Sequence, residues 1–183
     1  MNQLRDILAS MRLQQWIKNL FLFAALIFSG HLFQLHDLIL TAEGFVLFSF
    51  AASGIYIFND ITDLEQDKLH PVKSKRPLPS GKVSVQIAGL VATMLVAFSI
   101  IGAFFLGLGF GLSVLTYAVL NVGYSLKLKE IVIIDVMTIA AGFVIRVIGG
   151  ALLIEVAASE WLIICTILLS LFLGFSKRRH EIT

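Results

Sequence analysis

Charged residues, cysteines and prolines are all scarce in this sequence. Lys, Arg, Asp and Glu make up 14% of its 183 residues, against about 25% in an ordinary soluble domain, and 58% of the residues are apolar. A soluble protein of this size could not bury so much apolar surface, so lipid must act as part of its solvent. The single cysteine, Cys165, excludes an intrachain disulfide and a cysteine metal cluster. The net charge of +2 gives no support to nucleic-acid binding.

The apolar residues form runs long enough to cross a membrane. A bilayer core of about 30 Å needs roughly 20 mostly apolar residues per helix. We therefore predict an all-α, polytopic transmembrane helix bundle of about six spans, built as a single membrane domain over residues 1–183. The predicted spans are Leu20–Leu38, Thr41–Phe58, Val85–Leu106, Leu108–Gly123, Ile131–Ile154 and Trp161–Phe175. A Gly-rich stretch over residues 102–111 predicts a tight turn between the third and fourth spans.

The basic residues gather in segments that would lie on one side of the membrane. If the amino terminus is inside, the inner segments are residues 1–19, 59–84, 124–130 and 176–183, and they hold all but one of the 14 Lys and Arg residues. The positive-inside rule then predicts that these segments are cytoplasmic. The exception, Arg146, falls inside the fifth span, where an arginine is costly and normally faces protein or a wet cavity. Arg146 is either the buried structural partner of an acidic group or part of a site.

An acidic cluster ends the second span, in the segment Asn59-Asp60-Ile-Thr-Asp63-Leu-Glu-Gln-Asp67. If the helix continues past the membrane, residues 59, 63 and 67 lie near one face and Asp60 lies beside them. Carboxylates so placed repel one another, and a hard divalent cation removes that repulsion because Mg²⁺ prefers oxygen ligands. We therefore predict that Asn59, Asp60, Asp63 and Asp67 hold Mg²⁺.

A basic, proline-stiffened loop follows the acidic cluster. It contains all three prolines of the chain and carries Lys73, Lys75 and Arg76. Because proline fixes φ, this segment predicts a shaped loop rather than a helix. An acidic helix end beside such a loop suits a metal-bridged diphosphate, since the metal neutralises some phosphate oxygens and the basic side chains contact others. A plain solvated loop would explain the basic residues but not the spacing of the acidic ones.

Four motifs in order along the chain carry a resemblance to a known family. They are Arg12-x-x-Gln-Trp-x-Lys18-Asn19; the acidic cluster with its basic loop; Tyr124-Ser-Leu-Lys127, followed by Asp135 and Gly-Phe-x-x-Arg146; and Phe175-Ser-Lys177-Arg-Arg-His-Glu181. The acidic motif resembles the first aspartate-rich motif of the UbiA prenyltransferase superfamily. The other motifs resemble its decaprenyl-phosphate phosphoribosyltransferase branch. The chain stops as the second polar motif of that superfamily begins, so we expect it to correspond to the amino-terminal two-thirds of a UbiA-like fold.

The resemblance implies a Mg²⁺-dependent, multi-pass transferase of the cell membrane. It would move phosphoribosyl from phosphoribosyl pyrophosphate to a polyprenyl phosphate and release pyrophosphate. The catalytic residues would be Asp60, Asp63 and Asp67. The implied substrate-binding residues are Arg12, Lys18, Asn19, Lys73, Lys75, Arg76, Tyr124, Lys127, Asp135, Arg146, Lys177 and Glu181. Arg12 and Lys18 would hold the acceptor phosphate. Ordinary anchoring of Trp16 and Lys18 at the membrane interface would also explain this segment.

Other functions remain open at this point. A UbiA-type prenyltransferase would use the same metal motif with a prenyl diphosphate donor and an aromatic or lipid acceptor, and an inactive truncated remnant would keep the motifs without activity. A carrier is disfavoured, because transporters place their polar groups near the bilayer midplane and show repeated halves. The sequence contains no phosphate-binding Gly-x-x-x-x-Gly-Lys loop, dinucleotide fingerprint or nucleophile elbow, so nucleotide hydrolysis and acyl-enzyme chemistry have no support.

Overall fold

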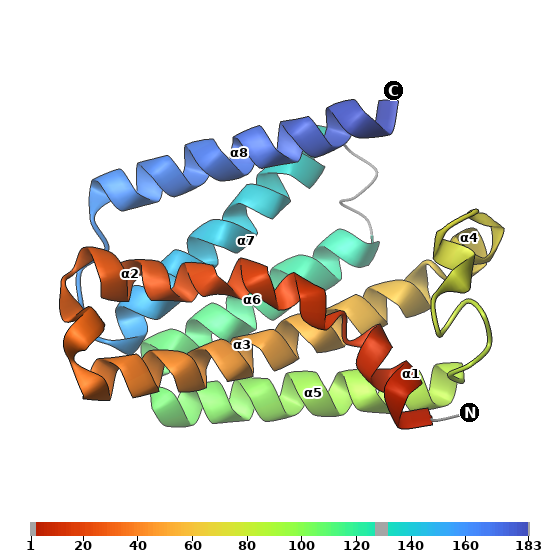
Figure 1. Ribbon diagram of the computed structural model, residues 1–183, viewed down its shortest axis with the longest axis horizontal. Coiled ribbons are helices and arrows are strands. Elements are labelled where there is room, and N and C mark those ends of the chain that lie inside the picture. The colour runs from red at the N-terminus through yellow and green to blue at the C-terminus, as the bar shows by residue number, and fades with distance from the viewer. Residues whose placement is uncertain (1–2, 127–131, 183) are drawn as a thin grey trace.

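The computed structural model describes residues 3–126 and 132–182, and the helices there pack as a bundle (Figure 1). In chain order the elements are α1 (Gln3–Ser10), η1 (Leu13–Leu22), α2 (Phe23–Phe28), η2 (His31–Phe33), α3 (Leu35–Thr62), α4 (Leu64–Leu69), η3 (Lys73–Lys75), α5 (Val85–Leu106), α6 (Leu108–Leu126), α7 (Val132–Leu153) and α8 (Glu160–Ile182). Within the described ranges every regular element is a helix, with η marking 3₁₀ turns. The all-α class is therefore confirmed.

Four of these helices, α3, α5, α6 and α7, are long and apolar enough to cross a membrane. The first and sixth predicted spans correspond to shorter apolar helical segments, Leu13–Phe28 and Glu160–Ser176, so the count of six spans is not confirmed. The break between the first two predicted spans also lies earlier than expected. Gly30 has φ 78°, a left-handed conformation that glycine adopts readily, and it ends α2 before η2 and α3 begin.

Two helices, α3 and α7, make most of the contacts that hold the bundle together. α3 packs against α5, α6 and η1, while α7 packs against α6, α8, α2 and η1. Phe48 of α3, Phe110 and Val114 of α6 and Leu22 of η1 are fully buried where these elements meet. The amino-terminal segment is therefore held against both central helices.

Two kinds of contact fix η1 in that place. The Trp16 indole Nε1 donates to the Ser53 hydroxyl of α3 at 3.0 Å, and that hydroxyl donates to the Met11 carbonyl at 2.9 Å. At α7, Gly150 lies so close that a Cβ built on it would collide with the backbone carbonyl oxygen of Leu22. Only glycine allows the backbones of η1 and α7 to approach this closely.

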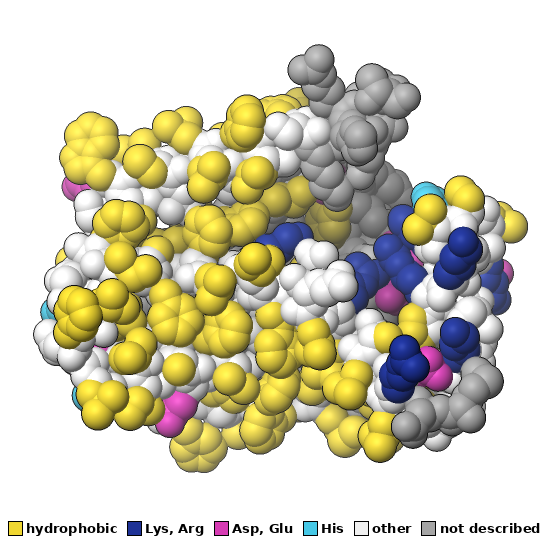
Figure 2. Space-filling view, in the orientation of Figure 1, with side chains coloured by type: hydrophobic (Ala, Val, Ile, Leu, Met, Phe, Trp, Pro, Cys, Tyr) yellow, Lys and Arg dark blue, Asp and Glu magenta, His cyan; other side chains and the backbone are white. Residues whose placement is uncertain are grey.

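The polar segments share one end of the bundle. Figure 1 places α1, α4, the end of α6 and the carboxy-terminal end of α8 at the same end of the long axis. Lys and Arg side chains gather beside acidic ones at that end, whereas hydrophobic side chains cover most of the rest of the face in Figure 2. This arrangement brings together the described parts of the predicted inner segments.

Candidate functional site

The acidic cluster lies where α3 gives way to α4. α3 ends at Thr62, and Asp63 separates the two helices. The backbone N–H of Asp63 donates to the Asn59 carbonyl at 3.0 Å, and that of Asp67 donates to the Asp63 carbonyl at 2.8 Å. Helical spacing thus continues across the break, as the sequence predicts.

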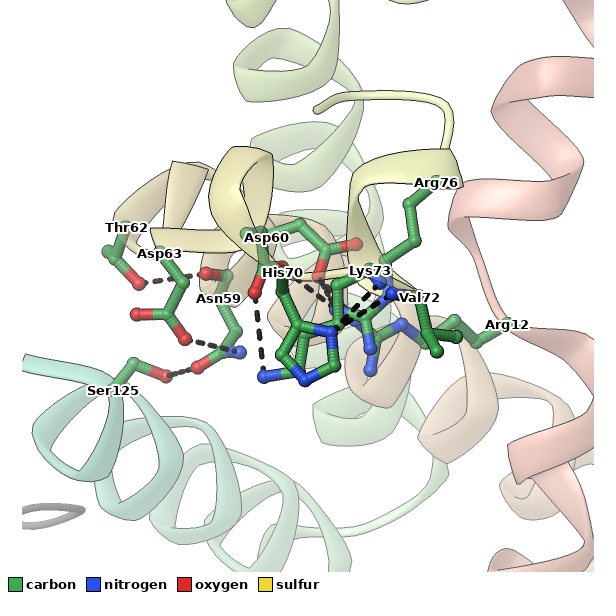
Figure 3. Close-up of polar contacts among 11 residues, drawn as sticks. Arg12, Asn59, Asp60, Thr62, Asp63, His70, Val72, Lys73, Arg76 and Ser125 are labelled. Carbon is green, nitrogen blue, oxygen red and sulfur yellow. Dashed lines mark hydrogen bonds and ion pairs between the residues drawn. The ribbon is translucent and has the colours of Figure 1, made fainter. Parts of the chain in front are cut away.

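The acidic cluster divides into two pairs. Asp60 and Asp67 are buried, with 3% and 2% of their surface exposed, and both face the basic loop. Asn59 instead donates to the Asp63 carboxylate at 3.2 Å and accepts from the Ser125 hydroxyl of α6 at 3.0 Å. Figure 3 shows this second pair on the Ser125 side. The acidic residues therefore do not act as one helical face: the buried two contact the basic loop, and the other two contact each other beside α6.

Basic side chains from two distant segments hold Asp60 and Asp67. Arg76 Nη1 donates to Asp60 Oδ1 at 3.1 Å and to Asp67 Oδ2 at 2.9 Å. Lys73 Nζ lies 3.5 Å from Asp67 Oδ1, and Arg12 forms an ion pair with Asp60. Figure 3 shows Arg12 and Arg76 converging on Asp60. The predicted acidic and basic motifs therefore meet, whereas Lys75 is exposed at the end of η3.

Arg12 has an unusual backbone conformation. Its φ of 52° and ψ of 53° are left-handed, which is uncommon for a residue with a Cβ. Its guanidinium also lies 5.2 Å from the centroid of the Tyr56 ring. Such conformations persist where surrounding contacts determine them and are frequent at functional sites. Here the Arg12 side chain contacts Asp60 through an ion pair and the Tyr56 ring through its guanidinium.

The donor set of the acidic cluster fits Mg²⁺ in chemistry. The buried carboxylates of Asp60 and Asp67 face one position, and the Asn59 amide and the Asp63 carboxylate lie beside them. Carboxylate and amide oxygens are the ligands that Mg²⁺ prefers. Among the residues that the structure describes, no group of three His, Cys, Asp or Glu side chains is gathered around one point. Arg76 Nη1 occupies the place between Asp60 and Asp67. A four-residue metal site at Asn59, Asp60, Asp63 and Asp67 stays a prediction.

Two cavities are lined by predicted site residues, and the residues that the sequence grouped together are divided between them. The first has a volume of about 610 Å³ and is lined by Arg12, Gln14, Gln15, Asp60 and Arg76, among others. The second has a volume of about 390 Å³ and is lined by polar and aromatic side chains: Lys18, Tyr56, Tyr117, Asn121, Tyr124, Thr138, Phe143 and Arg146. Arg12 and Lys18 therefore line different cavities.

The two predicted site residues of α7 are connected with the second cavity, because Arg146 lines it and Asp135 contacts Tyr124, which also lines it. The Tyr124 hydroxyl donates to Asp135 Oδ1 at 2.5 Å, and Asp135 is 3% exposed. Asn19 is fully buried behind Arg146: its Oδ1 accepts from Arg146 Nε at 2.8 Å and its Nδ2 donates to Ser49 at 2.9 Å. Asn19 thus positions Arg146 rather than lining the cavity.

Sequence reasoning missed three polar residues of the second cavity, Tyr56, Tyr117 and Asn121. The last two lie four residues apart on α6, on the turns before Tyr124 and Ser125, so a polar stripe along an apolar span was the available signal. Lys127 lies outside the described residues, as do the side chains of Lys177 and Glu181. Their predicted roles stay predictions.

These features define a membrane protein with an acidic and basic site at one end of a helix bundle. The chain belongs to the UbiA prenyltransferase family, whose model matches residues 20–178.

Two relatives agree with that assignment, and one solved structure agrees with the fold. The decaprenyl-phosphate phosphoribosyltransferase of Corynebacterium glutamicum is 34% identical over 178 residues, covering 94% of this chain and 53% of that protein. The protein of the same name from Mycolicibacterium smegmatis is 31% identical over 185 aligned positions, covering 99% and 58%. A UbiA homolog from Archaeoglobus fulgidus bound to DMAPP and Mg²⁺ has a TM-score of 0.75 at 22% identity, covering 91% of this chain and 60% of that one, and shares the fold. The chain spans a little over half the length of these proteins.

Proposed function

We propose that the chain forms the catalytic end of a Mg²⁺-dependent membrane transferase that moves phosphoribosyl from phosphoribosyl pyrophosphate to a polyprenyl phosphate. The observation that carries this proposal is the meeting of buried Asp60 and Asp67 with Arg12, Lys73 and Arg76 at one end of the bundle. Two relatives at 31–34% identity that are named decaprenyl-phosphate phosphoribosyltransferase support it. In this proposal, residues 1–183 form one membrane domain.

Asp60 and Asp67 would hold the metal, with Asn59 and Asp63 reaching it directly or through water. Mg²⁺ supplies Lewis-acid neutralisation of a pyrophosphate leaving group. Arg76 and Lys73 lie beside these carboxylates, so both are close enough to contact donor phosphate oxygens, although Arg76 would have to leave its place between Asp60 and Asp67 to admit the metal. The side chains would thus provide charge stabilisation and positioning.

The reaction exchanges one carbon–oxygen bond for another. A phosphate oxygen of the polyprenyl phosphate attacks the anomeric carbon of the ribose, the bond from that carbon to pyrophosphate breaks, and pyrophosphate leaves with the electron pair. Positive charge develops at the anomeric carbon and negative charge on the leaving group. The basic side chains around Asp60 and Asp67 lie where they can stabilise the leaving group.

The proposed site lies on the cytoplasmic side of the cell membrane, with the amino terminus inside. The position of the basic segments supports this orientation, since positive residues favour cytoplasmic loops. A water-soluble, charged donor would then reach the site from the cytoplasm, and a lipid acceptor would reach it from the membrane.

Reconstitution in lipid tests the proposal. The chain is incubated with Mg²⁺, phosphoribosyl pyrophosphate and a polyprenyl phosphate, alone and fused to the remaining carboxy-terminal part of the Corynebacterium glutamicum relative, with Asp63→Ala as a control. A lipid product that needs Mg²⁺ and is lost in the variant supports the proposal. Activity that appears only in the fusion marks the chain alone as inactive. The absence of product in both forms overturns the phosphoribosyl assignment.

A second candidate function is prenyl transfer from a prenyl diphosphate donor. The structural neighbour bound to DMAPP and Mg²⁺ favours it, since that protein shares the fold. An assay that supplies both donors together separates the two candidates. Prenyl transfer is supported if the prenyl diphosphate is consumed and suppresses phosphoribosyl transfer, even when phosphoribosyl pyrophosphate is in excess.

A further inference from the structure

Arg146 is a buried cation well inside a membrane-spanning helix. Only 4% of its surface is exposed, and it lies 11 residues after Asp135 on α7, about 16 Å further along the axis. A buried charge at this depth is costly unless an opposite charge or a set of hydrogen bonds compensates it. The contacts of Arg146 therefore decide what compensates its charge.

Every observed partner of the guanidinium is neutral. Nε donates to Asn19 Oδ1 at 2.8 Å, Nη1 donates to the Gly142 carbonyl at 2.7 Å, and Nη2 donates to the Tyr117 hydroxyl at 3.0 Å. The rings of Phe48, Tyr117 and Phe143 lie 4.6–5.6 Å away. Within the described ranges no carboxylate pairs with Arg146, so a structural ion pair with an acidic residue does not account for it.

The guanidinium also retains binding capacity. Arginine has five N–H groups, and the three hydrogen bonds to neutral partners use three of them. Two N–H groups therefore have no acceptor among the described residues. One of these N–H groups is on Nη1 and the other on Nη2, and a guanidinium N–H forms strong, charge-assisted hydrogen bonds to phosphate oxygens.

A cavity of suitable size adjoins Arg146, with a mostly apolar lining that includes a few polar side chains. Its volume is about 390 Å³, and its wall includes Lys18, Asn121 and Tyr124 as well as the arginine. Small-molecule sites of about 300–1,000 Å³ with a few convergent polar groups are typical of ligand binding. The cavity thus combines space with a buried cation.

We propose that this cavity is a binding subsite for a phosphate monoester, with Arg146 as its deep anion-binding residue. The inference rests on the proposed function and specifies which substrate group lies deep in the protein. A prenyl chain in the same place would leave the Arg146 charge buried without an anion, which is unfavourable. The monoester belongs either to the ribose 5-phosphate end of the donor or to the polyprenyl phosphate acceptor, and both carry the same chemistry.

Binding of small probes to the whole chain in detergent tests the subsite. The probes are ribose 5-phosphate for the donor, farnesyl phosphate for the acceptor, and pyrophosphate with Mg²⁺ for the acidic cluster. Arg146→Gln is compared with Arg5→Gln, a matched change at an exposed arginine of α1. Arg146→Gln is expected to weaken binding of one monoester about 10- to 100-fold and to leave pyrophosphate binding unchanged, because it removes charged hydrogen bonds from one subsite only.

Thr138→Phe is a second variant that leaves the arginine in place. Thr138 lines the same cavity, so the larger ring is expected to exclude the monoester while Arg146 keeps its three neutral partners. This variant keeps the test decisive even if Arg146→Gln folds poorly. Thermal unfolding of each variant, measured without ligand, identifies a loss of folding.

The outcomes separate this subsite from the proposed function. Loss of ribose 5-phosphate binding assigns the subsite to the donor, and loss of farnesyl phosphate binding assigns it to the acceptor. Monoester binding that both variants leave unchanged, or no monoester binding at all, overturns the subsite even when phosphoribosyl transfer proceeds. Consumption of a prenyl diphosphate with no phosphoribosyl transfer would instead overturn the proposed function.

Discussion

Asp60 and Asp67 share one nitrogen of a single arginine: Arg76 Nη1 lies 3.1 Å from an oxygen of the first and 2.9 Å from an oxygen of the second. Both carboxylates are buried, so each needs a positive partner to remain ionised at low cost. A divalent cation between the same two carboxylates would meet the same need. The guanidinium and the proposed metal would therefore compete for one position.

Arg76→Gln is expected to expose that competition. Without the guanidinium the two carboxylates repel each other, so the melting temperature falls in the absence of metal. Mg²⁺ then restores much of the loss, and Mn²⁺ binds more tightly than to the wild type. Thermal unfolding with and without Mg²⁺, together with a Mn²⁺ titration, measures both effects.

Lys75→Gln is the matched control, because Lys75 lies on the same loop and is exposed. It should leave the melting temperature and the Mn²⁺ affinity close to the wild type. Equal Mg²⁺ stabilisation of the wild type and Arg76→Gln would refute the competition.

If the proposed phosphoribosyl transfer occurs, Asp67→Asn is expected to reduce its rate about 100-fold or more, because Asp67 is a proposed metal ligand. Partners that merely orient metal ligands contribute about 10- to 100-fold, so a ligand itself should reach at least the upper end of that range. Initial rates at several Mg²⁺ concentrations measure the change. Glu65→Gln, an exposed acidic residue on the same helix, should retain activity. Similar losses in the two variants would mean that charge in α4, rather than ligation, matters.

The hydropathy pattern predicted the long spans well. The predicted third span, Val85–Leu106, has the same bounds as α5, and the fourth begins at Leu108 like α6. In lipid every backbone polar group must be satisfied within the chain, so an apolar run of sufficient length becomes a helix. The turn at Gly30 could not be found in this way, because it depends on one backbone angle and not on hydropathy.

The candidate site was predictable in its components but not in its pairings. Four-residue spacing indicated that the acidic residues lie together, since helices fix that spacing. It could not show that Arg76 comes between Asp60 and Asp67, because loop placement depends on tertiary packing. The neutral surroundings of Arg146 were equally hidden, as they combine η1, α3, α6 and α7.

Ser53→Ala is expected to destabilise the protein by about 1–3 kcal/mol. The change leaves the Trp16 indole N–H and the Met11 carbonyl without their partner, and unsatisfied buried polar groups carry that cost. Unfolding by denaturant in detergent measures it. Thr93→Ala is the control, because its exposed hydroxyl bonds only to its own helix, at the Gly89 carbonyl, and the change should stay within about 0.5 kcal/mol. Equal values for both variants would show that η1 is not held by this contact.

Gly150→Ala is expected to destabilise the protein by about 3 kcal/mol, because the added Cβ would collide with the Leu22 carbonyl. The Leu22 backbone can move away from this Cβ only if η1 separates from α7. Gly89→Ala is the same change on α5 with open space around the Cβ, so it should be neutral or stabilise by up to about 1 kcal/mol. Denaturant unfolding compares the two. Separation of η1 also draws Asn19 away from Arg146, so monoester binding should weaken only in the α7 variant. Normal stability with normal binding in Gly150→Ala would mean that η1 does not need this close approach, and the positioning role of Asn19 would fail with it.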